Sequence, residues 1–134
     1  MESRIGLGLV VGLLLAAAAP QDDATKKDKE KIQGKWKVIS VEAGGKREKN
    51  GEGDIWTFKG DEMVTAEVPR KYKLDATKKP KSFDLSGEVV NMAGIYSLEG
   101  DELKVCLGPA EKPPSAFSSK GDKHVLMVLK RQKR

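Results

Sequence analysis

The side chains that carry most enzyme chemistry are scarce in this sequence. It contains a single histidine, His124, and a single cysteine, Cys106. One imidazole and one distant thiol supply neither a metal cage nor a nucleophile with its base. Carboxylates are plentiful, but they fall in turns and linkers, and their spacing places no pair on a buried face for general acid and base work. We therefore predict a protein that is not an enzyme, with no catalytic residue, bound metal or cofactor.

Acidic residues recur instead in a pattern that is typical of tight turns. Segments 58–63 and 98–103 both read hydrophobe, charge, Gly-Asp-Glu, hydrophobe. A calcium site would need more oxygen-bearing side chains than one acidic pair per turn provides. A glycine at the first turn position suits two-residue β-hairpins, so both segments are interpreted as hairpin turns.

The elements around these turns have the periodicity of strands. After Gly34, apolar and polar residues alternate, most clearly at Tyr72 and Leu74 and again at Leu103 and Val105. One face of such a strand is buried and the other is exposed to solvent, which is typical of antiparallel sheets. On this basis the sequence predicts eight strands, at residues 35–43, 54–59, 63–68, 71–75, 82–86, 94–98, 102–107 and 124–131.

Short antiparallel strands that follow one another through hairpins lose their exposed edges when they close into a barrel. We therefore predict an all-β fold, a small eight-stranded antiparallel up-and-down barrel with a short helical turn at 28–33 before it. A two-sheet sandwich is the alternative. Two longer connections, 44–53 and 108–121, are the places where a binding surface outside the barrel would lie.

The N-terminal residues 1–19 have the layout of a secretory signal peptide. An uncharged apolar run follows Arg4 and ends in alanines. This run is about 15 residues long, whereas a membrane span needs roughly 20. We predict export to the periplasm or the extracellular space, with no stable membrane anchor after cleavage. Residues 21–31 contain no apolar side chain larger than alanine, and residues 20–30 are predicted to be a charged linker, which leaves residues 31–134 as the folded domain.

The charge of the chain indicates no particular partner. The net charge is +5, and the 34% of charged residues mix both signs, as on an ordinary soluble surface. Basic clusters at 78–81 and 130–134 lack the interleaved aromatic residues of a single-strand nucleic-acid platform. We expect a monomer that does not bind nucleic acid, and a weak contact with an anionic envelope component stays open.

The pattern Gly34-x-Trp36 near the start of the first strand, with a basic residue at the end of the last, resembles the signature of lipocalins and fatty-acid-binding proteins. In those families the tryptophan closes the floor of the barrel, and a late arginine or lysine packs across its ring. The resemblance implies that Trp36 is the floor and that Arg131 or Lys130 covers it. A cation over an indole contributes about 0.5 to 2 kcal/mol.

Longer blocks carry a closer resemblance. In order, IQGKW, YKLDATKKPKSFDL, GIYSLEGDELKVC and VLKR resemble a family of small secreted lipocalin-like domains that is expanded in planctomycete bacteria. The resemblance covers about residues 28–131, with one departure at Ala76, where the family often has proline. The function of that family is unknown, so the resemblance implies a fold and export and little more.

Two functions remain open at this point. The Arg-x-Tyr pair with which fatty-acid-binding proteins hold a carboxylate has no counterpart in the last strand, which reads VLMVLKR. We predict an exported lipocalin-like domain that binds a small apolar ligand at the open end of the barrel. The alternative is a filled-core interaction or inhibitor module of the cell envelope that acts through its loops, as small periplasmic metalloprotease inhibitors share this barrel type. A continuous interior cavity of about 300 Å³ or more would favour the ligand.

Overall fold

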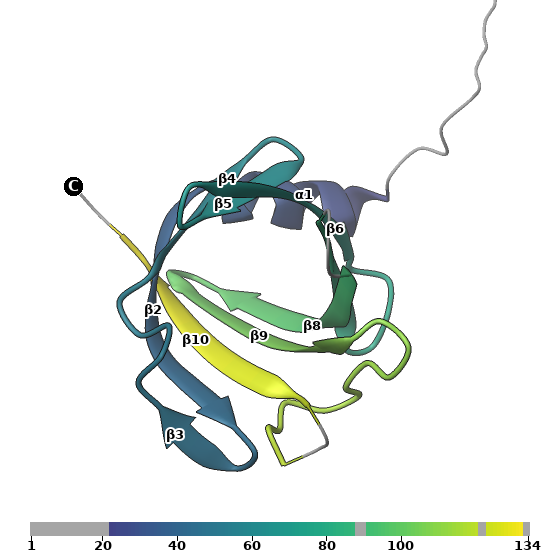
Figure 1. The fold of residues 1–134 in the computed structure, drawn as a ribbon. Helices are drawn as coiled ribbons and strands as arrows, with labels where there is room; N and C mark the ends of the chain where they lie inside the picture. The colour runs from purple at the N-terminus through teal and green to yellow at the C-terminus, as the bar shows by residue number, and fades with distance from the viewer. Residues whose placement is uncertain (1–21, 88–90, 121–122, 133–134) are drawn as a thin grey trace, which may run out of the picture.

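The fold was obtained as a computed structural model, which describes residues 22–87, 91–120 and 123–132. The predicted signal peptide lies outside the described residues. The predicted fold class is confirmed, because eight antiparallel strands close into a barrel and one short helix precedes it (Figure 1). The elements in chain order are α1 (Asp23–Ile32), β2 (Gly34–Ala43), β3 (Lys46–Glu48), β4 (Ile55–Lys59), β5 (Glu62–Thr65), β6 (Val68–Asp75), β7 (Lys81–Ser86), β8 (Asn91–Glu99), β9 (Glu102–Pro109) and β10 (Val125–Arg131).

Each strand from β5 to β10 pairs with the strand before it, β4 pairs with β2, and β10 also pairs with β2 to close the barrel. The closing ladder runs from Val125 opposite Ala43 to Arg131 opposite Trp36. Strand β3 pairs only with the end of β2 and extends from the barrel as a small hairpin. The first and last strands of the barrel are therefore neighbours, which brings the two ends of the predicted signature together.

Several strand boundaries differ from the prediction, and one strand was missed. A turn at Ala66 and Glu67, where φ is 52° and 62°, interrupts the predicted strand 63–68, and β6 already begins at Val68. Two consecutive positive φ angles give the twist that suits a two-residue hairpin, but this turn lacks the glycine that usually marks it. Strand β3 lies in the predicted loop 44–53 and was missed because its residues are all charged and exposed.

Helix α1 corrects the prediction for residues 20–30, because Asp23 to Glu30 belong to the helix and not to a linker. The side chain of Asp22 caps its first turn and accepts a hydrogen bond of 2.8 Å from the backbone N–H of Thr25. The helix buries Thr25, Asp28 and Ile32, which are spaced to share one face. The predicted helical turn at 28–33 is thus only the second half of a longer helix.

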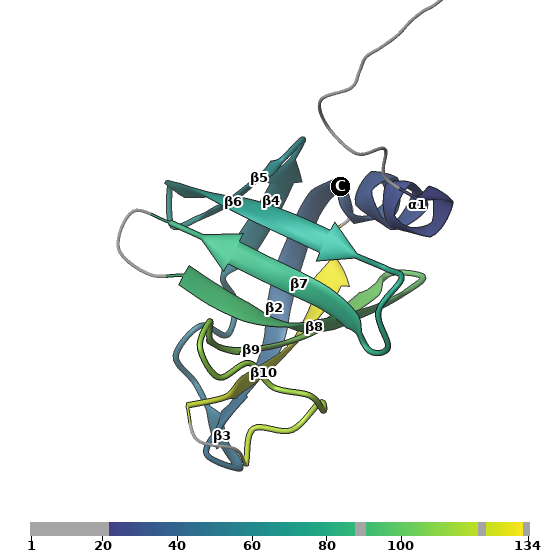
Figure 2. The same cartoon turned by 90° about the vertical axis from the view of Figure 1, so that its right-hand side faces the viewer.

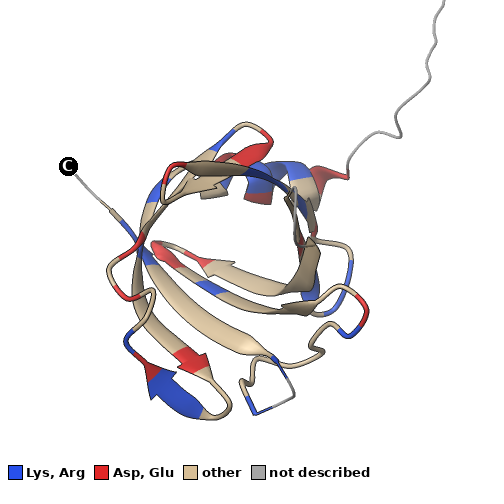
Figure 3. Ribbon diagram, in the orientation of Figure 1, with Lys and Arg blue, Asp and Glu red and all other residues tan. Residues whose placement is uncertain are grey.

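The barrel has two unlike ends, and Figure 2 shows α1 beside one of them. This closed end also carries the β4–β5, β6–β7 and β8–β9 turns. The opposite end, called the mouth below, carries the β5–β6 turn and the β9–β10 connection. Lys, Arg, Asp and Glu are spread around the wall and the connections in Figure 3.

Aromatic side chains fill the interior toward the closed end. Neighbouring rings among Trp56, Phe58, Tyr72, Phe83 and Tyr96 have centroids 5.0 to 6.3 Å apart, mostly in edge-to-face or tilted contacts. Every one of these residues belongs to the buried core. A ligand that entered the barrel would therefore meet a packed floor.

Candidate functional site

The tryptophan and arginine of the predicted signature are in direct contact at the closed end. Trp36 is fully buried, and its indole Nε1 donates a hydrogen bond of 2.8 Å to the carbonyl of Ile32. The guanidinium carbon of Arg131 lies 4.3 Å from the centre of the Trp36 ring. Arg131 also donates to the carbonyl of Gln33 at 2.9 Å and to that of Lys31. The arginine thus joins the last strand, the first strand and the end of α1.

The other two signature residues have different roles. Gly34 has a φ of +114°, and a Cβ at this position would lie 3.2 Å from Nη1 of Arg131. Glycine therefore leaves space for the guanidinium group and adopts a backbone conformation that other residues rarely reach. Lys130 is exposed, and Arg131 is the residue that covers the ring of Trp36. This set of contacts closes the barrel and presents no group to a ligand.

A buried carboxylate, which the sequence analysis missed, holds α1 against the barrel. Asp28 accepts hydrogen bonds from the hydroxyl of Tyr96 at 2.6 Å and from Nζ of Lys81 at 2.9 Å. Burial, followed by the hydrogen bond to Asp28, raises the pKa of Tyr96. A tyrosine that stays protonated beside a paired aspartate is a stable donor, and the cluster therefore anchors the helix.

A second group of contacts ties α1 to the β4–β5 turn. Lys29 forms an ion pair with Asp61, and the hydrogen bond from Lys29 lowers the pKa of Asp61. The side-chain amide of Gln33 donates to the hydroxyl of Tyr72 at 2.9 Å and accepts from the N–H of Gly60 at 2.7 Å. Burial raises the pKa of Tyr72. The floor of the barrel is therefore held by polar contacts as well as by apolar packing.

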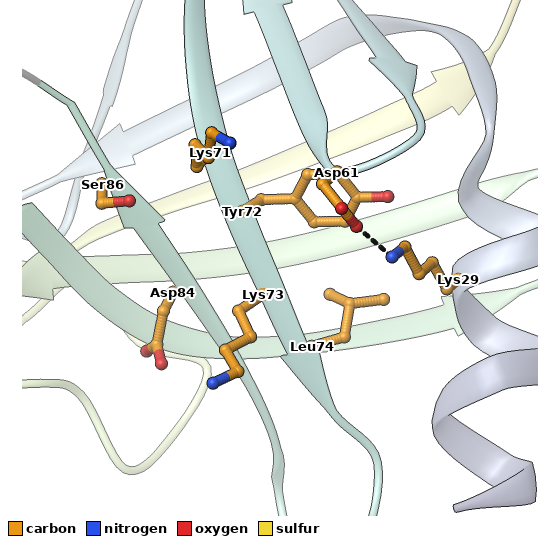
Figure 4. Close-up of a pocket in the computed structure, with 8 residues that line it drawn as sticks. All are labelled: Lys29, Asp61, Lys71, Tyr72, Lys73, Leu74, Asp84 and Ser86. Atoms are coloured by element: carbon orange, nitrogen blue, oxygen red, sulfur yellow. Dashed lines mark hydrogen bonds and ion pairs between the residues drawn. The ribbon is translucent and has the colours of Figure 1, made fainter. Parts of the chain in front are cut away.

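An outer pocket of about 410 Å³ lies between α1 and strands β6 and β7 (Figure 4). It is lined by Lys29, Asp61, Lys71, Tyr72, Lys73, Leu74, Asp84 and Ser86. Lysine and aspartate side chains face it together, and the pair of Lys29 and Asp61 crosses one side. Such a mixed set of charges selects neither anions nor cations, so we do not assign a ligand to this pocket.

The mouth has a different lining from the closed end. Met92, Val125 and Met127 are only partly buried and pack against the apolar core from this side. Val68, at the rim, is 49% exposed. Apolar side chains that remain partly open to solvent inside a concave element are typical of ligand sites.

One basic side chain faces the same space. Arg70 lies on the side of β6 that carries Tyr72 and Leu74, because alternate residues of a strand share a face. It stands opposite the fully buried Met63 in the β5–β6 ladder. The Nε of Arg70 is buried and has no hydrogen-bond partner in the part of the chain that the structure describes. The sequence analysis missed Arg70 because the predicted strand began one residue later, at 71.

The two residues first considered for catalysis both contact the β9–β10 connection. A ring nitrogen of His124 lies 3.1 Å from the carbonyl oxygen of Lys112. The sulfur of Cys106 lies 3.4 Å from the carbonyl oxygen of Ser118. Burial raises the pKa of the Cys106 thiol. The histidine and the cysteine therefore secure a loop, and they do not contact one another in any interaction of the described structure.

Two wider surveys of the described ranges, 22–87, 91–120 and 123–132, gave no site. No three His, Cys, Asp or Glu side chains in them are grouped so that they could hold a metal ion. No helix in them has the length and apolar character of a membrane span. Comparison of the chain with protein-family models, curated proteins and solved structures gave no match. The resemblance to the planctomycete family therefore stays a prediction based on its motifs.

Proposed function

We propose that this protein is an exported, non-enzymatic binding domain of the lipocalin-like type, which takes a small apolar ligand into the mouth of its barrel. The observation that carries the proposal is the contrast between the two ends. The closed end is sealed by α1, Trp36 and Arg131, whereas the mouth keeps Met92 and Met127 partly exposed. A barrel that is closed at one end and apolar at the other offers a single route to its interior.

The packed floor limits the size of the ligand. The rings of Phe58, Phe83 and Tyr96 occupy the interior near α1, so a ligand would reach only the upper part of the barrel. Methionine is flexible and adapts its shape to a guest, so Met92 and Met127 can move aside at little cost. These features support a small ligand, one that fits a pocket of about 300 Å³ or less, which is the lower end of the usual range of pocket volumes.

The loop-based interaction module is the second candidate, and one observation supports it. The connection 110–120 is held firmly on the barrel: the backbone N–H of Gly45 donates to the carbonyl of Ser119 at 3.1 Å and to its hydroxyl at 3.0 Å. The two long predicted loops therefore form one continuous surface beside the mouth. A preformed surface of this kind would suit a protein or envelope partner.

A substitution that fills the mouth distinguishes these two functions. The folded domain is titrated with the neutral apolar dye N-phenyl-1-naphthylamine, and saturable binding of one dye per chain is expected. Met92→Trp should abolish binding by filling the mouth, because Met92 faces the core. Asn91→Trp, the neighbouring exposed position on β8, should leave binding unchanged. Absence of saturable dye binding to the unaltered domain would rule out the ligand site and leave the loop surface as the better candidate.

A further inference from the structure

We infer that the ligand of the mouth is a small amphipathic carboxylate whose charged end is bound by Arg70. This inference rests on the proposed function, because it specifies the chemistry of a ligand in the same space. It adds an ionic contact to a site that is otherwise apolar.

The first observation is the position of Arg70 on the barrel wall. Its partner across the ladder is Met63, which is 1% exposed and belongs to the core. Residues directly opposite one another in an antiparallel pair project from the same face of the sheet. Arg70 therefore projects from the inner face of the barrel wall, near the β5–β6 turn at the mouth.

The second observation is that no ion pair or hydrogen bond links the side chain of Arg70 to another described residue. Among the described arginines, Arg47 lies 2.9 Å from Glu52 and Arg131 lies 3.4 Å from Asp101. For Arg70 no carboxylate lies within ion-pair distance in the ranges that the structure describes, and its Nε is buried without any acceptor. A buried donor left without an acceptor costs about 1 to 3 kcal/mol, and more when the group is charged. An anion that reached the guanidinium group after a small movement of the side chain would offset this cost.

The third step is the type of anion. A guanidinium group presents a planar fork of N–H donors that matches the two oxygens of a carboxylate. Val68 lies on the same face of β6 nearer the rim, and Met92 and Met127 lie on the inner side of the wall. A ligand with one carboxylate and one short apolar tail would satisfy both the guanidinium and these side chains.

The test compares two ligands that differ only in the head group. Binding of decanoate and of 1-decanol is measured calorimetrically at neutral pH. Decanoate is expected to bind the unaltered domain about 10-fold or more tightly than decanol, since a charged hydrogen bond contributes about 1.5 to 3 kcal/mol. Arg70→Met should remove this preference and leave the affinity for decanol nearly unchanged. Lys71→Met removes the same charge from the outer face of the next position on β6 and should have no effect.

The outcomes separate this inference from the proposed function. Decanol and decanoate binding with equal affinity would overturn the role of Arg70 but keep the ligand site. Absence of binding for both would overturn the two proposals together. Arg70→Lys keeps the charge without the fork, so an intermediate affinity for decanoate supports the inference even if Arg70→Met does not fold. An unchanged preference in either Arg70 variant would contradict it.

Discussion

Arg131 joins three parts of the molecule that are distant in sequence. It is the last residue of β10, it covers the ring of Trp36 on β2, and it donates to two carbonyl groups at the end of α1. Each contact is modest in energy by itself. Their combination at one side chain makes Arg131 the residue on which closure of the barrel depends most.

Arg131→Met tests this role. The variant loses the cation–π contact and the charged hydrogen bonds but keeps a side chain of similar length. We expect the free energy of unfolding to fall by about 2 to 4 kcal/mol. Urea denaturation followed by tryptophan fluorescence measures it.

The matched control is Lys130→Met at the adjacent exposed position, where a change within about 0.5 kcal/mol is expected. Equal destabilisation by the two variants would mean that Arg131 contributes no more than an ordinary surface residue.

At the residue scale, part of the site could be predicted from the sequence. The motif predicted contact between Trp36 and a late basic residue, although it could not choose between Lys130 and Arg131. The last strand is apolar on both faces, so the sequence alone does not show which side faces inward. The structure buries Leu129 completely, and Arg131, two residues further on, lies on the same face. Arg70 was not found because the turn at 66–67 was not predicted, so the expected strand began at 71 instead of at Val68.

Helix α1 is the element that closes one end of the barrel, and two of its three buried residues are polar. Thr25 accepts a hydrogen bond of 2.9 Å from the backbone N–H of Ala76, and Asp28 binds Tyr96 and Lys81. Ile32 is its only fully buried apolar side chain within the described helix. The helix is therefore positioned largely by specific hydrogen bonds.

Asp28→Ala should loosen this element. The variant leaves the buried hydroxyl of Tyr96 without its acceptor and removes the partner of Lys81. We expect the free energy of unfolding to fall by about 2 to 4 kcal/mol. Thermal or urea unfolding gives the value.

Glu30→Ala, at an exposed position of the same helix, should change it by no more than about 0.5 kcal/mol. A loss for Asp28→Ala as small as that of Glu30→Ala would show that the buried carboxylate does not hold the helix.

At the element scale, the strands could be predicted better than the helix. Alternation at Tyr72 and Leu74, and the Gly-Asp turns at 60–61 and 100–101, are local signals of strands and hairpins. The face of α1 that packs on the barrel has only one large apolar residue, so hydrophobic periodicity does not reveal it. The capping Asp22 was a local signal that could have been used, but the partners of Asp28 lie on β7 and β8, far along the chain.

For the whole molecule, the barrel divides into a packed half and an adaptable half. The aromatic cluster and α1 fill the first half, and the partly buried Met92 and Met127 lie in the second. Barrels of eight strands are just wide enough to be filled by side chains or to hold one small ligand. Under the proposed function, unequal packing along the axis would let one barrel do both. Composition and spacing could predict the barrel itself, but not the distribution of side-chain volume along its axis.

The most direct test of a ligand site in the mouth is the NMR spectrum of the methionine methyl groups. Met92 and Met127 line the mouth and are partly buried, whereas Met63 is 1% exposed in the packed interior. During titration with decanol, which lacks the carboxylate expected to approach Arg70 beside Met63, we predict saturable shifts of the Met92 and Met127 signals and little change for Met63. Shifts confined to Met63, or no shift of any of the three signals at high ligand concentration, would contradict the proposed function.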